Sequence, residues 1–225
     1  MAEFDPQRRK LTLKLVYYGP ALSGKTTNLI QLHELLAPEA RGEIMTLETQ
    51  NDRTLFFDLM PVGLTTPSGL VIRLKLFTVP GQVTLDSTRK AVLSRADGVV
   101  FVADSQRNQG INNSQSFESL EDNARKVGLE LDQTPLVVQF NKRDLPEVLP
   151  EQELRARWEA APWPLTFASA VSGEGVIETF RALLERVYPR LEELFSVSSQ
   201  HGLTLNMFLD VATRASAAPR PGMAL

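Results

Sequence analysis

Two hydrophobic periodicities alternate along the chain, one typical of strands and one typical of helices. Residues 11–17 have an apolar-rich strand pattern that runs into Gly19, and residues 26–36 carry leucines along one helical stripe. Residues 98–103 form a continuous apolar run, and residues 136–140 repeat this character apart from Gln139; such runs are typical of strands covered on both faces. The first part of the chain therefore predicts helices packed against a buried sheet.

The rest of the chain continues this alternation. Residues 55–64 and 70–77 predict a hairpin of two strands around a turn-rich connector. Further elements are expected as helices at 112–127, from Pro150 and at 176–194, and as a short strand at 165–168. Strands that alternate with helices predict an α/β fold of three layers, in which helices cover both faces of a mostly parallel central sheet with one antiparallel hairpin strand.

The composition of the sequence changes after Phe195, where residues 196–202 are polar and small. We expect one domain over residues 1–195 and a C-terminal extension over 196–225, with a short amphipathic helix at 203–214 and a disordered remainder that has too little to bury. That helix could dock on the body of the protein, contact a partner or lie on a membrane surface. Its charges, one aspartate and one arginine, cancel, which argues against attraction to anionic lipid, so docking on the body is preferred.

Composition excludes several classes of protein. A net charge of −3 argues against nucleic acid, which needs a concentrated basic surface. The absence of cysteine excludes a disulfide scaffold, a thiol nucleophile and a palmitoyl or prenyl anchor. No apolar run approaches the roughly 18 residues of a membrane span, and the first residues lack the features of a signal peptide. We expect a cytoplasmic monomer without a membrane anchor.

The strongest local signal is the octapeptide G-P-A-L-S-G-K-T at residues 19–26, a full match to the phosphate-loop pattern G-x-x-x-x-G-K-[ST]. Glycines let the backbone turn tightly around phosphates, so that backbone N–H groups and the following helix N-terminus point at the anion. Lys25 would lie on the β- and γ-phosphates, and the Thr26 hydroxyl would bind Mg²⁺. The predicted phosphate-binding residues are Gly19, Ala21, Leu22, Ser23, Gly24, Lys25, Thr26 and Thr27.

A second motif, Asn141-Lys142-Arg143-Asp144, follows the strand at 136–140 and selects the base. A carboxylate at Asp144 can accept two hydrogen bonds from the Watson–Crick edge of guanine, whereas adenine offers no such pair. Asn141 can bond the other edge of the base and tie this loop to the phosphate loop, and the stem of Lys142 can cover a face of the ring. A backbone N–H of Ser169-Ala170 could reach guanine O6. Alone, the tetrapeptide could be a helix-capping turn; downstream of a phosphate loop it indicates guanine.

With these motifs in this order, the chain resembles the small GTPases of the Ras superfamily. Within that superfamily it is most similar to the bacterial MglA family of polarity and motility switches. Besides the loops above, the similar runs are Tyr17–Pro20, Asp52–Asp58, Thr78–Gln82, Val99–Ser105 and Asn141–Pro146. The similarity covers about residues 10–194 and leaves the tail without a counterpart.

The resemblance implies roles for two switch regions. Thr54 would add a second hydroxyl to Mg²⁺, the amide of Gly81 would hold the γ-phosphate, and Gln82 would orient the attacking water. Arg53 maps to an arginine thought to act on the transition state in cis, although it could also be a solvated surface residue beside Asp52. The implied partners are GTP and GDP, effectors that read the switches, and a roadblock-type activating protein of the MglB kind.

Two departures from the usual small-GTPase pattern bear on catalysis. Thr78 stands where most small GTPases have aspartate, so Mg²⁺ would rely more on water, and Ala21 stands where glycine is usual. A methyl group there could displace Gln82 or Arg53, and a misplacement of about 1 Å can cost roughly 10²-fold in rate. The first hypothesis is a switch that hydrolyses GTP; the alternative is a GTP-dependent binding module with little hydrolysis. An ATP-dependent kinase is disfavoured by Asp144 and by the lack of an arginine-rich lid.

Overall fold

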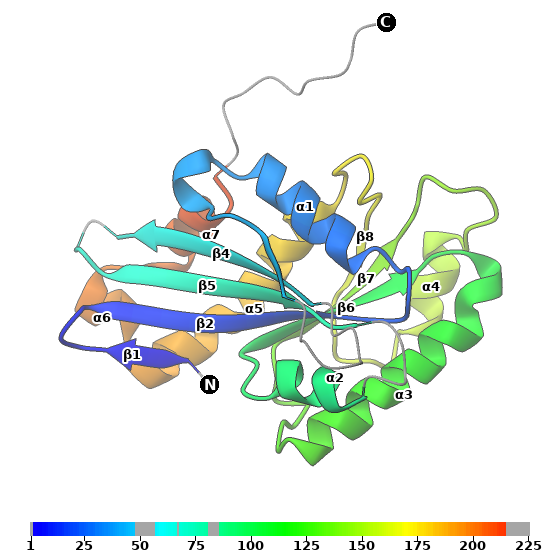
Figure 1. The fold of residues 1–225 in the computed structure, drawn as a ribbon, viewed down its shortest axis with the longest axis horizontal. Helices are drawn as coiled ribbons and strands as arrows, with labels where there is room; N and C mark the ends of the chain where they lie inside the picture. The colour runs from blue at the N-terminus through cyan, green and yellow to red at the C-terminus, as the bar shows by residue number, and fades with distance from the viewer. Residues whose placement is uncertain (1, 48–56, 67, 81–85, 215–225) are drawn as a thin grey trace, which may run out of the picture.

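The computed structural model describes residues 2–47, 57–66, 68–80 and 86–214, in which a twisted sheet lies between two layers of helices (Figure 1). The strands are β1 (Glu3–Asp5), β2 (Lys10–Tyr18), β3 (Met45–Leu47), β4 (Phe57–Thr65), β5 (Val71–Thr78), β6 (Gly98–Asp104), β7 (Leu136–Asn141) and β8 (Leu165–Phe167). Their order is β3-β4-β5-β2-β6-β7-β8, with β1 beside β2.

Most of the sheet is parallel, as the sequence predicts. Strands β5, β2, β6, β7 and β8 run in one direction, and β4 runs antiparallel to β5 as the predicted hairpin strand. The three-residue strands β1 and β3 also pair antiparallel, with β2 and β4 respectively. These two strands were not predicted from the sequence, because three residues are too few to establish an alternating pattern.

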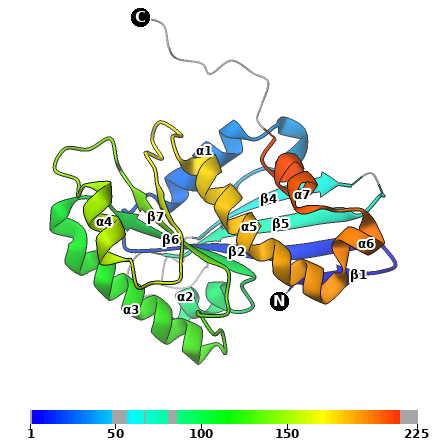
Figure 2. The ribbon, with the colours of Figure 1, turned by 180° about the vertical axis from the view of Figure 1, so that it is seen from behind.

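Helices cover both faces of the sheet, and the alternation of side chains along β2 separates two hydrophobic cores. Leu13 and Leu15 face α1 (Lys25–Leu35) and α5 (Val176–Phe195), while Val16 and Tyr18 face the opposite layer. That opposite layer consists of α2 (Asp86–Leu93), α3 (Gly110–Lys126) and α4 (Glu151–Arg157), and short 3₁₀ turns lie at η1 (Pro38–Ala40) and η3 (Arg107–Gln109). The view from behind shows α5 crossing the sheet beside α7 (Figure 2).

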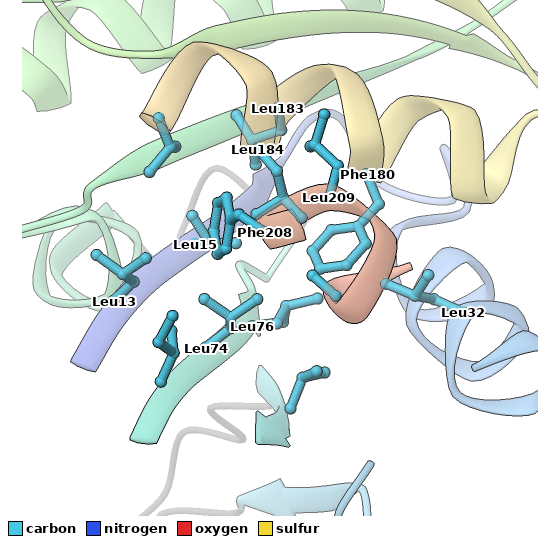
Figure 3. Close-up of a cluster of buried hydrophobic side chains, with 14 of the residues drawn as sticks. Leu13, Leu15, Leu32, Leu74, Leu76, Phe180, Leu183, Leu184, Phe208 and Leu209 are labelled. Atoms are coloured by element: carbon cyan, nitrogen blue, oxygen red, sulfur yellow. The ribbon is translucent and has the colours of Figure 1, made fainter. Parts of the chain in front are cut away.

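The segment after α5 packs into the same core as the sheet. Helix α6 (Val197–His201) leads to α7 (Leu205–Ala212), whose Phe208 and Leu209 lie among leucines of β2, β5 and α5 (Figure 3). The amide of Ala37 donates to the carbonyl oxygen of Arg214 at 2.9 Å, and the Tyr188 hydroxyl donates to that of Leu203 at 2.8 Å. The sequence left three placements open for this segment. In the structure it docks on the body of the protein.

Two helices have no counterpart among the predicted elements. Helix α2 buries Thr88 and Arg89 beside Val92 and Leu93, a mixed face that gives no clean apolar stripe. Helix α6 occupies a stretch that reads as polar, although Val197 is buried. In the part of the chain that the structure describes, no helix has the length and apolar character needed to span a bilayer.

Candidate nucleotide-binding site

The predicted phosphate loop connects the end of β2 to the start of α1, at the edge where the parallel strands end. Gly19 has a φ of 151°, and a Cβ there would lie 2.2 Å from the carbonyl oxygen of Val102 in β6. Gly24 has a φ of 95°, and its Cβ would lie 2.2 Å from Nδ2 of Asn141. Both motif glycines are therefore required by the close packing of the loop on β6 and on the end of β7.

Within this loop, Pro20 is buried, but the next two apolar residues, Ala21 and Leu22, do not pack against the body. Leu22 has a φ of 62° and an exposed fraction of 88%, and Ala21 is also exposed. Ser23 is fully buried, and its carbonyl oxygen accepts a hydrogen bond from Asn141 at 2.8 Å. The loop is thus anchored at its second half and open to solvent at its tip.

The side chain of Lys25 is buried at the start of α1, with 6% of its surface exposed. Its Nζ donates to the carbonyl oxygens of Gly19 at 3.0 Å and Pro20 at 2.6 Å. Burial, and secondly the positive charge of Arg89, lowers the pKa of Lys25 to about 7. Two carbonyls stabilise an ammonium less than an anion does, so phosphate oxygens placed here would favour the charged form.

Asn141 joins the phosphate loop to the predicted base-binding segments. Besides its bond to Ser23, its Oδ1 accepts from the amide of Ala170 at 2.9 Å. Asp144 is exposed, and one of its carboxylate oxygens accepts from the Ser169 hydroxyl at 2.6 Å. The structure therefore brings together the predicted phosphate loop, the N-K-x-D loop and the Ser169-Ala170 segment at one edge of the sheet.

Two details of the base loop differ from simple expectation. The ammonium of Lys142 pairs with the buried carboxylate of Asp104 at 2.7 Å, so the end of β6 fixes the side chain that is expected to cover the base. The amide of Ala170 is bound to Asn141, and the expected contact with guanine O6 would require this amide to be shared between two acceptors. Asp104 was not among the predicted site residues.

Comparison with known proteins agrees with this arrangement. The model of the Arf, or ADP-ribosylation factor, family matches residues 5–187. The mutual gliding-motility protein MglA of Myxococcus xanthus (strain DK1622) is 43% identical over 193 residues, which cover 86% of this chain and 99% of that protein. The chain is an MglA-like small GTPase.

Four site residues predicted for this MglA-like GTPase lie outside the described part of the chain. They are Arg53, Thr54, Gly81 and Gln82. The neighbouring strand ends are described: β4 begins at Phe57, and β5 ends at Thr78, which is 3% exposed. The catalytic and switch roles of the four residues remain predictions.

The described residues of this MglA-like GTPase fit a magnesium ion that is held mainly through nucleotide and water. Thr26 is exposed at the start of α1, directly after Lys25. No group of three or more His, Cys, Asp or Glu side chains in the described ranges could form a metal site of its own. Mg²⁺ usually keeps several waters and binds phosphate oxygens together with one or two protein oxygens, which matches a hydroxyl donor without a carboxylate cage.

Arg89 is a buried cation whose charge acts on Lys25, and it was not predicted from the sequence as a site residue. It is 1% exposed, lies 4.5 Å above the ring of Tyr18, and donates to the hydroxyls of Ser119 at 3.2 Å and Ser116 at 3.4 Å. Among the described residues no carboxylate forms an ion pair with it, and its Nε has no partner. The sequence carries no signal for a buried cation at this position, because the contacts of Arg89 with Tyr18 and the two serines depend on where α2 and α3 meet.

Proposed function

We propose that this chain is a molecular switch that binds GTP and GDP with Mg²⁺ and hydrolyses GTP. The supporting observation is the position of Asn141, whose one side chain joins the phosphate loop at Ser23 to the Ser169-Ala170 segment beside Asp144. A phosphate-binding loop and an exposed carboxylate suited to guanine are thereby held at a fixed separation. Family membership supports GTP hydrolysis in general terms.

In this proposal, the residues at the loop act mainly by binding and orientation. The backbone amides of the loop and the ammonium of Lys25 hold the phosphates, while Asp144 accepts from N1 and N2 of guanine. Lys25 exchanges its bonds to Gly19 and Pro20 for bonds to phosphate oxygens. The Thr26 and Thr54 hydroxyls would hold Mg²⁺, which neutralises phosphate charge when it is bound.

Hydrolysis is assigned to residues of the two predicted switches. Gln82 would orient the attacking water, Gly81 would hold the γ-phosphate through its amide, and Arg53 would stabilise charge that develops in the transition state. Loss of the γ-phosphate would then release both switches, which makes the conformation dependent on the bound nucleotide.

The binding part of the proposal is tested by isothermal titration calorimetry of nucleotide-free protein with GDP, GTP and ATP in the presence of Mg²⁺. We expect binding of both guanine nucleotides and a large preference over ATP. Equal affinity for ATP and GTP, or no heat with any of them, would refute the assignment of Asp144 and of the loop.

The second candidate is a GTP-dependent binding module with little hydrolysis, and it is favoured by Ala21. This residue lies in the exposed part of the loop, where a methyl group could face the attacking water and the residues that orient it. Single-turnover hydrolysis by the wild type and by Ala21→Gly separates the two. A rate that rises by about 10²-fold in the variant supports the slow module, and equal rates remove Ala21 from the explanation.

For the cellular role, we propose polarity or motility signalling in the bacterial cytoplasm, since the relative is named a mutual gliding-motility protein. We also propose a roadblock-type activating protein of the MglB kind as a partner that binds the switch regions, together with effectors. Stimulation of GTP turnover by such a protein, absent in Arg53→Ala, would support this pairing and the role of Arg53.

A further inference from the structure

A buried side-chain amide lies one layer below Asn141 on the same strand. Gln139 and Asn141 are two residues apart in β7 and so share a face of the sheet. Gln139 is fully buried, and its Nε2 donates to Oδ1 of Asn28 at 2.9 Å and to the Thr179 hydroxyl at 2.9 Å. Gln139 therefore bridges two helices, α1 and α5, across the face of β7.

The α1 end of this bridge reaches the phosphate loop. Asn28 is fully buried in the first turn of α1, and its Nδ2 donates to the carbonyl oxygen of Gly24 at 2.9 Å. The same carbonyl accepts from the backbone amide of Asn28 at 2.9 Å. Because Gly24 is in a left-handed conformation at the N-cap of α1, these two bonds fix the direction in which the loop enters α1.

The α5 end of the bridge reaches the loop that follows β8. The Thr179 hydroxyl is fully buried, lies 2.7 Å from the carbonyl oxygen of Gly175 and lies 2.9 Å from the hydroxyl of Thr166. Gly175 ends the loop that carries Ser169 and Ala170, and it immediately precedes α5. Gln139 thus connects the loop that is expected to read the base with the loop that is expected to bind phosphate.

The fold is less stable with glutamine at position 139 than it would be with leucine there. Oε1 of Gln139 is buried without a partner in the described structure, and such an acceptor costs about 1–3 kcal/mol. An apolar side chain would suit a strand that is buried along its whole length. A buried polar connection of this kind holds its ends in one arrangement, which makes geometry rather than stability the reason for it.

We propose that Gln139, with Asn28 and Thr179, is a positioning residue that sets the distance between the phosphate loop and the base-reading loop. This inference rests on the proposed binding of guanine nucleotides. None of the three side chains is assigned to contact with the nucleotide. They act through Gly24 at one end and Gly175 at the other, so disturbing them weakens the simultaneous grip on base and phosphates.

The test uses a hydroxyl-to-methyl substitution at the far end of the bridge. Thr179→Val keeps the size of the side chain but removes the acceptor for Gln139, whereas Thr179→Ser keeps the hydroxyl. The matched control is Thr134→Val, because Thr134 is also a buried threonine, 3% exposed, whose hydroxyl donates to the carbonyl oxygen of Glu130 at 2.7 Å, before β7 begins. Dissociation of the fluorescent nucleotide mant-GDP is measured in full-length protein, together with the melting temperature of each nucleotide-free variant.

We expect Thr179→Val to accelerate mant-GDP dissociation about three- to tenfold, as for the loss of one buried hydrogen bond, with Thr179→Ser and Thr134→Val within about twofold of the wild type. If Thr179→Val does not fold, Gln139→Met, which keeps the volume of glutamine, takes its place with the same expected acceleration. A lowered melting temperature with an unchanged dissociation rate, or no rescue by serine, would show that the bridge is only structural and would overturn the inference. If the wild type itself bound no mant-GDP, the proposed function would fail as well.

Discussion

Nucleotide binding should change the protonation of Lys25. Without nucleotide, its side-chain nitrogen lies buried against two carbonyl oxygens, and its pKa is lowered to about 7. Phosphate oxygens would replace those carbonyls on binding and favour the charged form, which moves the pKa back toward the ordinary value of 10.5. Above neutral pH, each binding event should therefore draw a proton from the buffer.

The size of this uptake follows from the two pKa values. At pH 8.5, Lys25 with a pKa of about 7 carries about 0.03 of a proton, so its uptake on binding is close to one proton. At pH 7.0 it carries about half a proton, and the uptake falls to about 0.5. The terminal phosphate of GDP titrates near pH 6, so it contributes little at pH 8.5.

Calorimetry of GDP binding in buffers of different ionisation enthalpy measures the uptake directly. The number of protons taken up is the slope of the observed binding enthalpy plotted against the ionisation enthalpy of the buffer. We expect slopes of about 0.5 at pH 7.0 and about 1 at pH 8.5. Lys25→Arg is the control, because an arginine stays charged at both values and should show almost no slope at pH 8.5 if it still binds. A slope near zero for the wild type at pH 8.5 would refute the argument that Lys25 is neutral before nucleotide arrives.

The same lowered pKa has a consequence for folding stability. Between pH 7 and 10.5 the unfolded chain holds a proton on Lys25 that the folded, nucleotide-free protein mostly lacks. The unfolded state binds more protons in this window, so the contribution of Lys25 to the free energy of unfolding rises with pH and is smallest below pH 7.

Three further substitutions test other parts of the structure. Asp144→Asn should reduce the preference for GDP over ADP by about 10²-fold or more, because two charge-assisted hydrogen bonds to guanine are lost; competition against mant-GDP measures it. Phe208→Ala should lower the free energy of unfolding, measured by urea denaturation, by about 3–5 kcal/mol. The control Leu194→Ala, at a residue that is 50% exposed, should lower it far less. Equal effects of the two variants would mean that α7 is not part of the core. Arg89→Met should leave the melting temperature of the nucleotide-free protein unchanged or raise it. The substitution replaces a buried cation, which no carboxylate of the described residues pairs with directly, by an apolar side chain of similar length. A clear fall would show that the contacts with Tyr18 and the two serines, and the charge of Asp86, outweigh the cost of burial.

The parts of the fold that are long and strongly patterned could be predicted from the sequence. Strands β6 and β7 are dominated by apolar residues and α5 carries a regular stripe, so each was found close to its observed position. Short elements such as β1 and α2 could not, because their conformation depends on pairing or packing with segments far away in the chain.

The candidate site divides in the same way. The phosphate loop and the N-K-x-D loop are local motifs, and their residues could be named without a structure. The pair of Lys142 with Asp104, the stacking of Arg89 on Tyr18 and the bridge through Gln139 join residues that are far apart in sequence. Nothing in the composition of either partner marks such contacts, so they emerge only when the strands are placed side by side.

The packing of α7 also bears on how the protein is made. The leucines of β2 and β5 emerge from the ribosome early, but Phe208 and Leu209, which cover them, follow only after the rest of the sheet and α5 have been synthesised. At about 5–20 residues per second, the growing chain would carry an incompletely covered apolar surface for several seconds. Chaperone binding to the nascent chain should therefore persist until residues beyond 212 have left the exit tunnel.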